Sequence, residues 1–106
     1  MDKETVLKKS LREFKKRVNE DFPVYKMFLF GSQATGKTHK DSDVDLIIVS
    51  RKFRQLNFIM RSAHMYDYWT LPMPVDFLCY TPEEFNRLKR QITIVKEAVE
   101  NGIEIN

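Results

Sequence analysis

Two aspartates stand two positions apart at the start of an apolar run, and that spacing favours metal chemistry. Asp43 and Asp45 flank Val44, and the letters LIIV follow within residues 44–49. Because side chains alternate between the two faces of a strand, both carboxylates project from the same face. Two close carboxylates raise each other's pKa, and a divalent cation resolves that repulsion. The spacing therefore predicts Mg²⁺, which takes hard oxygen ligands from one or two carboxylates and from substrate phosphates.

A third acid, Asp76, stands near the start of another apolar run, VDFLCY, at residues 75–80. If that strand lies beside the strand of Asp43 and Asp45, its carboxylate reaches the same ions. Two ions about 3.5–4 Å apart can hold the attacking and the leaving oxygen of an in-line displacement. Asp76 could also take the proton of the attacking hydroxyl as a general base. The alternative for Asp76 is a strand-edge carboxylate that pairs with a nearby lysine.

The segment before the aspartates, GSQATGKTHKDS at residues 31–42, has residues that suit phosphate binding. Gly31 lets backbone N–H groups approach a phosphate closely, and Ser32 adds a hydroxyl donor. Lys37 could neutralise an oxygen of a triphosphate, and its alternative is a solvated loop lysine. Together with the three acids, these residues indicate transfer of a nucleotidyl group.

Two other motifs overlap this segment, and both fail on structural context. Residues 31–38 fit the P-loop pattern G-x-x-x-x-G-K-[ST] through Gly36 and Lys37. A P-loop must open into a helix, yet the next predicted strand begins at Val44, too soon for one. An EF-hand calcium loop starting at Asp41 would need glycine and glutamate where the chain has Leu46 and Lys52.

The predicted elements around the motif form a small sheet with helices packed on it. Strands are expected at 24–30, 44–49 and 75–80, the second of them buried on both faces. A first helix is expected from the apolar stripe of Leu7, Leu11, Phe14 and Val18, and a second over residues 53–71.

The last helix has the clearest start signal in the chain. Thr81 and Glu84 form a capping box, and Pro82 suits the first helical position. Gly102 suits the C-terminal cap. One continuous buried stripe is expected along this helix, from Phe85, Leu88, Ile92, Val95 and Val99.

Composition indicates a single domain over residues 1–106, because the chain is 42% hydrophobic and 31% charged over 106 residues. A net charge of +3 is too small to predict direct nucleic-acid binding. The lone Cys79 fits a reducing compartment, and no apolar run reaches the length of a membrane span. We therefore expect a cytoplasmic protein without a membrane partner, and the sequence is compatible with a homo-oligomer.

The motif Gly31-Ser32-x-Ala34-x-Gly36, followed by Ser42-Asp43-x-Asp45-Leu46 and by Asp76, resembles the DNA polymerase-β-like nucleotidyltransferase superfamily. Within it, the chain is similar to the minimal nucleotidyltransferases of bacteria and archaea. The resemblance extends over nearly the whole chain. It implies an α/β fold with a small mixed sheet and helices packed on it.

The resemblance also implies an activity and a set of roles. Asp43, Asp45 and Asp76 would be the catalytic and Mg²⁺-binding acids, and Gly31 and Ser32, with Gly36 and Lys37, would bind the nucleotide triphosphate. Mg²⁺-dependent transfer of AMP from ATP to a hydroxyl would follow. Minimal members are often antitoxins paired with a HEPN-domain toxin, and some adenylylate a tyrosine of that toxin.

One position departs from the family pattern, which commonly has arginine before the second glycine. This chain has Thr35 there, and threonine cannot make a charged contact with phosphate. Two functions follow as alternatives: an adenylyltransferase that modifies a partner protein, or a catalytically weak module that neutralises a HEPN partner by contact. A small-molecule nucleotidyltransferase of the aminoglycoside type is a poorer third option, since a second domain is expected to bind such a substrate.

Overall fold

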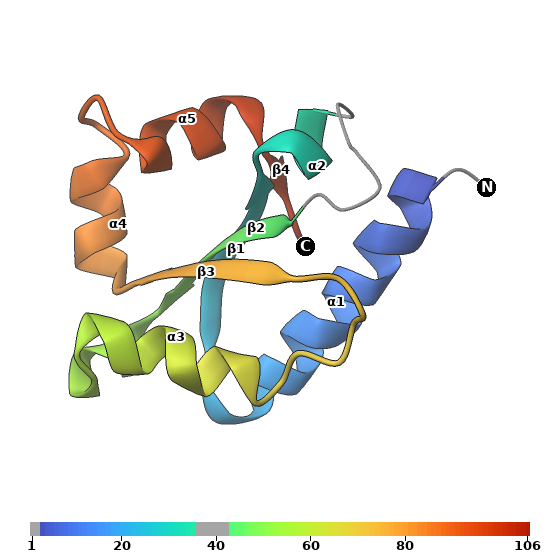
Figure 1. Ribbon diagram of the computed structural model, residues 1–106. Coiled ribbons are helices and arrows are strands. Elements are labelled where there is room, and N and C mark those ends of the chain that lie inside the picture. Colours follow the sequence, from blue (N-terminus) through green and yellow to red (C-terminus); the bar gives the residue numbers. More distant parts are fainter. Residues whose placement is uncertain (1–2, 36–42) are drawn as a thin grey trace.

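A mixed four-stranded sheet lies at the centre of the described residues (Figure 1). The computed structural model describes the backbone of residues 3–35 and 43–106 and the side chains of residues 6–34 and 43–106. Its elements are α1 (Lys3–Asp21), β1 (Val24–Phe30), α2 (Ser32–Thr35), β2 (Val44–Ser50), the 3₁₀-helix η1 (Arg51–Gln55), α3 (Phe58–Tyr66), β3 (Val75–Tyr80), α4 (Pro82–Leu88), α5 (Ile94–Asn101) and β4 (Ile103–Glu104).

The strands lie in the order β3-β2-β1-β4, with β2 and β3 parallel and the other two pairs antiparallel. This arrangement confirms the mixed sheet that the family resemblance implied. The predicted strands 24–30 and 75–80 have the observed bounds, and β2 runs one residue beyond its prediction. The short strand β4 was missed, because two residues carry no periodic pattern.

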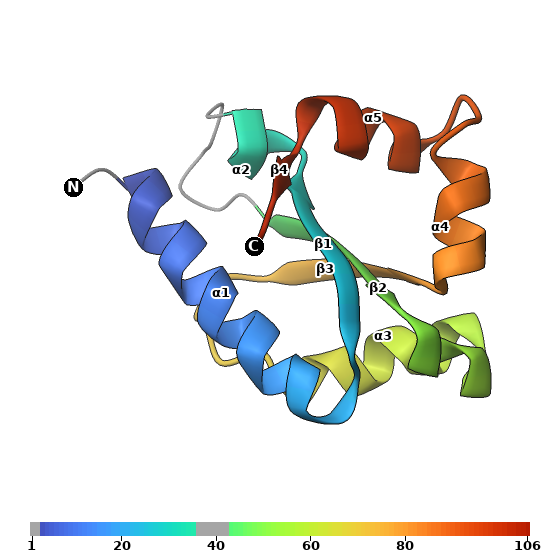
Figure 2. The same ribbon diagram turned by 180° about the vertical axis from the view of Figure 1, so that it is seen from behind.

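Helices cover both faces of the sheet. Even-numbered β2 residues pack with α1 and α3 in the larger core, where Leu11, Phe14 and Val18 are fully buried as predicted. Odd-numbered β2 residues Ile47 and Val49 pack with α4 and α5 on the other face. Figure 2 shows from behind that β1 runs between α1 and α5. Asp45 alone interrupts the burial of β2.

The predicted helix over residues 53–71 is wrong, because it is divided by a local cap. Leu56 is extended, and the Asn57 side chain accepts a 2.9 Å hydrogen bond from the Met60 backbone to start α3 afresh. The carbonyl groups of Phe53 and Leu56 accept hydrogen bonds from Arg61 Nε, which fix the break. The shortened α3 keeps Phe58, Ile59 and Met60 exposed.

The prediction of a single last helix is also wrong, because the structure has two helices there, α4 and α5. Its start is confirmed, since Thr81 and Glu84 form both bonds of the capping box. A second cap at Thr93 then begins α5, and Thr93 Oγ1 also donates a 2.7 Å hydrogen bond to the Leu88 carbonyl. Ile92 lies between the two helices and is 100% exposed, so the continuous buried stripe is interrupted there.

No helix in the described ranges combines the length and the apolar character that crossing a membrane requires.

Candidate active site

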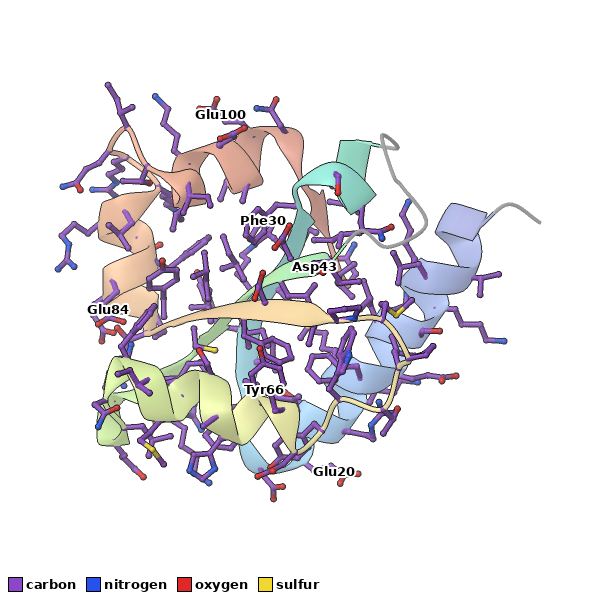
Figure 3. The ribbon with its side chains drawn as sticks, viewed as in Figure 1. Glu20, Phe30, Asp43, Tyr66, Glu84 and Glu100 are labelled. Carbon is purple, nitrogen blue, oxygen red and sulfur yellow. The ribbon has the colours of Figure 1, made fainter. Side chains whose placement is uncertain are left out.

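The predicted acids come together at one end of the sheet, where β2 and β3 begin. Asp45 and Asp76 are direct register partners in this parallel pair, about 4.8 Å apart at the backbone. Asp45 is two residues before Ile47 on β2, and Asp76 is two residues before Leu78 on β3. Because Ile47 and Leu78 face α4 and α5, both aspartates project from that face of the sheet. Asp43 lies one residue before β2, and Figure 3 shows it near Phe30 at this end.

The charges of the three acids act on one another. Burial raises the pKa of Asp45, and the nearby carboxylates of Asp76 and Asp43 raise it further. Within residues 3–35 and 43–106, no three acidic, histidine or cysteine side chains are close enough to form a ready metal site. One cation held by all three carboxylates would therefore require their side chains to move closer together.

The donor set nevertheless fits Mg²⁺. Three carboxylates lie at one end of the sheet and offer hard oxygen ligands. The charges of Asp76 and Asp43 raise the pKa of Asp45, and a cation would relieve this repulsion. Asp43, Asp45 and Asp76 as Mg²⁺ ligands stay a prediction.

Gly31 is the turn that brings the chain back beside these acids. Its φ of 75° lies in the left-handed region, which glycine adopts without strain. A β-carbon at Gly31 would meet the side chain of Asp45, the strand neighbour of Phe30. The helical turn α2 begins at the next residue, Ser32, and the Ala34 N–H donates a 3.1 Å hydrogen bond to the Gly31 carbonyl. The predicted phosphate-binding residues Gly31 and Ser32 therefore lie next to Asp45.

Gly36 and Lys37 lie outside the described residues. The P-loop alternative is nevertheless excluded by its neighbours, since α2 occupies Ser32–Thr35, inside the segment that would be the loop. The EF-hand alternative fails as well, because Asp45 and Leu46 are strand residues of β2.

A cavity of about 700 Å³ opens in front of the acids. Asp45 and Asp76 line its sheet side, together with the Phe30–Gly31 turn. One wall comes from α5 and the other from α3, and sequence reasoning missed the polar residues of both walls: Ser62, Tyr66, Glu97 and Asn101. Nothing in their local pattern distinguishes them from ordinary solvent-exposed residues, because only the tertiary packing of α3 and α5 brings them to the cavity.

The outer edge of β3 is held by side chains of α3. Tyr66 Oη donates a 2.8 Å hydrogen bond to the Val75 carbonyl, and Ser62 Oγ donates one of 3.2 Å to the Phe77 carbonyl. Arg61 Nη1 donates to the Cys79 carbonyl at 3.2 Å. These three carbonyl groups belong to alternate residues, so they point away from β2. Because β2 holds the other edge, the strand that carries Asp76 is fixed on both sides.

Arg61 joins this edge to α4. Its side chain is almost fully buried, and Nη1 also forms a 2.7 Å ion pair with Glu84 Oε1. Glu84 in turn accepts the Thr81 N–H of the capping box at 2.8 Å. Figure 3 shows Glu84 at the far end of β3 from Asp43, so this network supports the sheet from the end opposite the acids.

Comparison with known proteins gives three kinds of similarity. Residues 11–101 match the family model described as "Nucleotidyltransferase domain". The chain is 34% identical over 86 residues to the "Probable protein adenylyltransferase MntA" of Haemophilus influenzae, covering 77% of this chain and 74% of that protein. A Sulfolobus solfataricus protein described as a "putative nucleotidyltransferase" has the same fold, with a TM-score of 0.67 and 20% identity, and the match covers 95% of this chain and 80% of that chain.

Proposed function

Because this chain belongs to the nucleotidyltransferase-domain family, we propose that it transfers AMP from ATP to a hydroxyl group of a partner protein. The observation that carries the proposal is the adjacency of Asp45 and Asp76 beside the Gly31 turn, at the mouth of a 700 Å³ cavity. The Haemophilus relative, named as a protein adenylyltransferase, supports a protein acceptor.

In the proposed reaction, the acceptor oxygen attacks the α-phosphorus of ATP while the bond to pyrophosphate breaks. Asp76 takes the acceptor proton, because its carboxylate lies exposed at the cavity. The Gly31–Ser32 turn would lie against the phosphates, and Asp43, Asp45 and Asp76 would hold Mg²⁺. When bound, Mg²⁺ supplies charge neutralisation at the phosphates and orients the reacting oxygens.

The partner is proposed to be a HEPN-domain protein, and this chain its antitoxin. The support is the resemblance of the Gly-Ser and Asp-x-Asp motifs to minimal nucleotidyltransferases, together with the similarity to MntA. A single domain over residues 1–106, a cytoplasmic location and no direct nucleic-acid contact belong to the same proposal.

A second function has one observation in its favour. Thr35 replaces the arginine common in the family, which lowers the positive charge available to a triphosphate. A chain of this kind could neutralise its partner by contact while transferring AMP slowly or not at all.

One experiment separates the two functions. The protein is incubated with Mg²⁺, ATP and the product of the neighbouring gene, and that product is weighed by mass spectrometry. An AMP adduct that disappears in the Asp43→Asn/Asp45→Asn variant supports transfer. Asp67→Asn, which removes an exposed carboxylate outside the cavity, should leave the adduct unchanged. Neutralisation without any adduct, equal in the wild type and in the double variant, would falsify the enzymatic proposal.

A further inference from the structure

Helix α5 turns two polar side chains toward the cavity that contains Asp45 and Asp76. Glu97 and Asn101 are four residues apart, so they lie on one face of the helix, and both line the cavity. Among the residues that the structure describes, neither side chain has a hydrogen-bond or ion-pair partner. Glu100 differs in both respects, because it pairs with Lys96 at 4.0 Å and does not line the cavity.

Glu97 is separate from the three predicted metal ligands. Glu97 belongs to the α5 wall of the cavity, whereas Asp45 and Asp76 line its sheet side. Glu97 can therefore contact a part of the substrate other than the cation.

The end of α5 is fixed beside the phosphate-binding turn. The Gly102 N–H closes the helix on the Ala98 carbonyl at 2.8 Å, and a β-carbon on Gly102 would stand 2.6 Å from the Leu29 carbonyl oxygen. Asn101 therefore lies near the Phe30–Gly31 turn. Glu97 lies about 6 Å further along the helix axis, one turn away from the phosphates.

A carboxylate in a triphosphate site repels phosphate unless it faces a cation or a hydrogen-bond donor, and Glu97 is not one of the predicted metal ligands. The donors nearest to the phosphates of a nucleotide are the ribose hydroxyl groups, and the two oxygens of one carboxylate can accept from both. Asn101, between Glu97 and the Gly31 turn, offers an amide that can donate to a ribose oxygen. This order of groups along α5 follows the order of phosphate and ribose in a nucleotide.

We propose that Glu97 and Asn101 form the ribose subsite, and that Glu97 makes the protein select ribonucleotides over 2′-deoxyribonucleotides. The proposal rests on the proposed function, because it takes the cavity to be the nucleotide site. It goes further in naming the part of the substrate that α5 reads.

The test measures the Kd of ATP and of 2′-deoxy-ATP with Mg²⁺ by calorimetry, for the wild type and for Glu97→Ala. A hydrogen bond to a charged group is worth on the order of tenfold or more in affinity. The wild type should therefore bind ATP at least about tenfold more tightly than 2′-deoxy-ATP, and Glu97→Ala should bring this ratio close to one by weakening ATP. Glu100→Gln is the matched control, and it should keep the wild-type ratio.

Three outcomes would overturn the ribose subsite. The wild type could bind both nucleotides equally, or bind neither, or Glu97→Ala could keep the wild-type ratio while remaining folded by circular dichroism. If Glu97→Ala instead changes the preference for ATP over inosine triphosphate, Glu97 reads the adenine amine and the proposal is wrong. The binding test needs no partner protein, so it is independent of the transfer assay. An absent AMP adduct in the transfer assay would contradict the proposed function and would leave the ribose subsite unaffected.

Discussion

Gly31 stands so close to Asp45 that a β-carbon on Gly31 would lie 2.5 Å from Asp45 Oδ2. The turn after β1 and the carboxylate on β2 are packed as one unit, since Phe30 and Asp45 are also register partners. This short distance would let the backbone approach a phosphate beside the predicted metal ligands. The same short distance leaves no room for a side chain at position 31.

Gly31→Ala is expected to damage catalysis more than stability. The left-handed φ of 75° costs an alanine about 1–2 kcal/mol, and its β-carbon displaces the Asp45 carboxylate. Transfer of AMP should fall at least about tenfold, the cost of about 1.4 kcal/mol at the transition state. Urea unfolding and the transfer rate, measured well below the unfolding midpoint, separate the two effects. A Gly31→Ala protein with wild-type turnover would contradict this account.

Tyr66→Phe tests whether the α3 contacts position Asp76. The substitution keeps the ring but removes the hydroxyl that bonds the carbonyl of Val75, the residue before Asp76. Stability should fall by about 1 kcal/mol, and kcat should fall several-fold while the Kd of ATP is unchanged, since the Gly31 turn is untouched. Tyr25→Phe is the control, because Tyr25 is exposed on β1 away from the cavity. A weaker Kd at constant kcat would show that Tyr66 binds nucleotide instead.

Acid should weaken the Arg61–Glu84 pair. Burial raises the pKa of Glu84, but the hydrogen bonds from the Thr81 backbone and from Arg61 outweigh it, so the pKa lies below its ordinary value of 4.5. A carboxyl group of this kind contributes stability above its unfolded pKa and loses it as the pH falls through the folded value.

Glu84→Gln should therefore cost about 1 kcal/mol at neutral pH, allowing for the partial exposure of Glu84. The cost should shrink toward zero as the pH is lowered below 4.5. Urea unfolding across this range gives the measurement, with Glu13→Gln on the exposed face of α1 as the control. A cost that is the same at every pH would mean that the charge of Glu84 is immaterial.

Cys79 should be chemically silent in the folded protein. Its thiol is fully buried, and burial raises its pKa to about 12, although a hydrogen bond with Ser62 and the nearby charge of Arg61 oppose the rise. A colorimetric disulfide reagent at mildly alkaline pH should react only after the addition of urea. Ile92→Cys, at a fully exposed position, provides the fast-reacting reference. Equal rates at positions 79 and 92 would refute the buried thiol.

The sequence predicted the strands well because their signals are local. The apolar runs 24–30 and 75–80 are bounded by proline or by polar residues, and both strands have the predicted bounds. Pro82 and the Thr81–Glu84 capping box gave the start of α4 for the same reason. The sequence did not predict the register that brings Asp45 beside Asp76, and the shared site was stated only on the condition that the two strands are neighbours. Pairing between strands depends on the whole sheet and not on local signals.

The helices were predicted less well because caps compete with apolar periodicity. Asn57 and Thr93 each start a new helix inside a stretch whose apolar residues favoured one long helix. Both are good N-cap residues, so a local signal was present. The α5 wall of the cavity was not predicted for the same reason. Glu97 and Asn101 line the cavity only because the chain turns at Ile92, between α4 and α5.

The carbonyl groups of β3 that α3 occupies also bear on self-association. An open edge strand is a template on which another chain can add a strand and begin an aggregate. Here the outward carbonyl groups of Val75, Phe77 and Cys79 already accept hydrogen bonds, and the opposite edge is β4, only two residues long. Among the described residues, neither edge offers a long free template, so a second copy or a protein substrate has to dock on helices or at the cavity rather than extend the sheet.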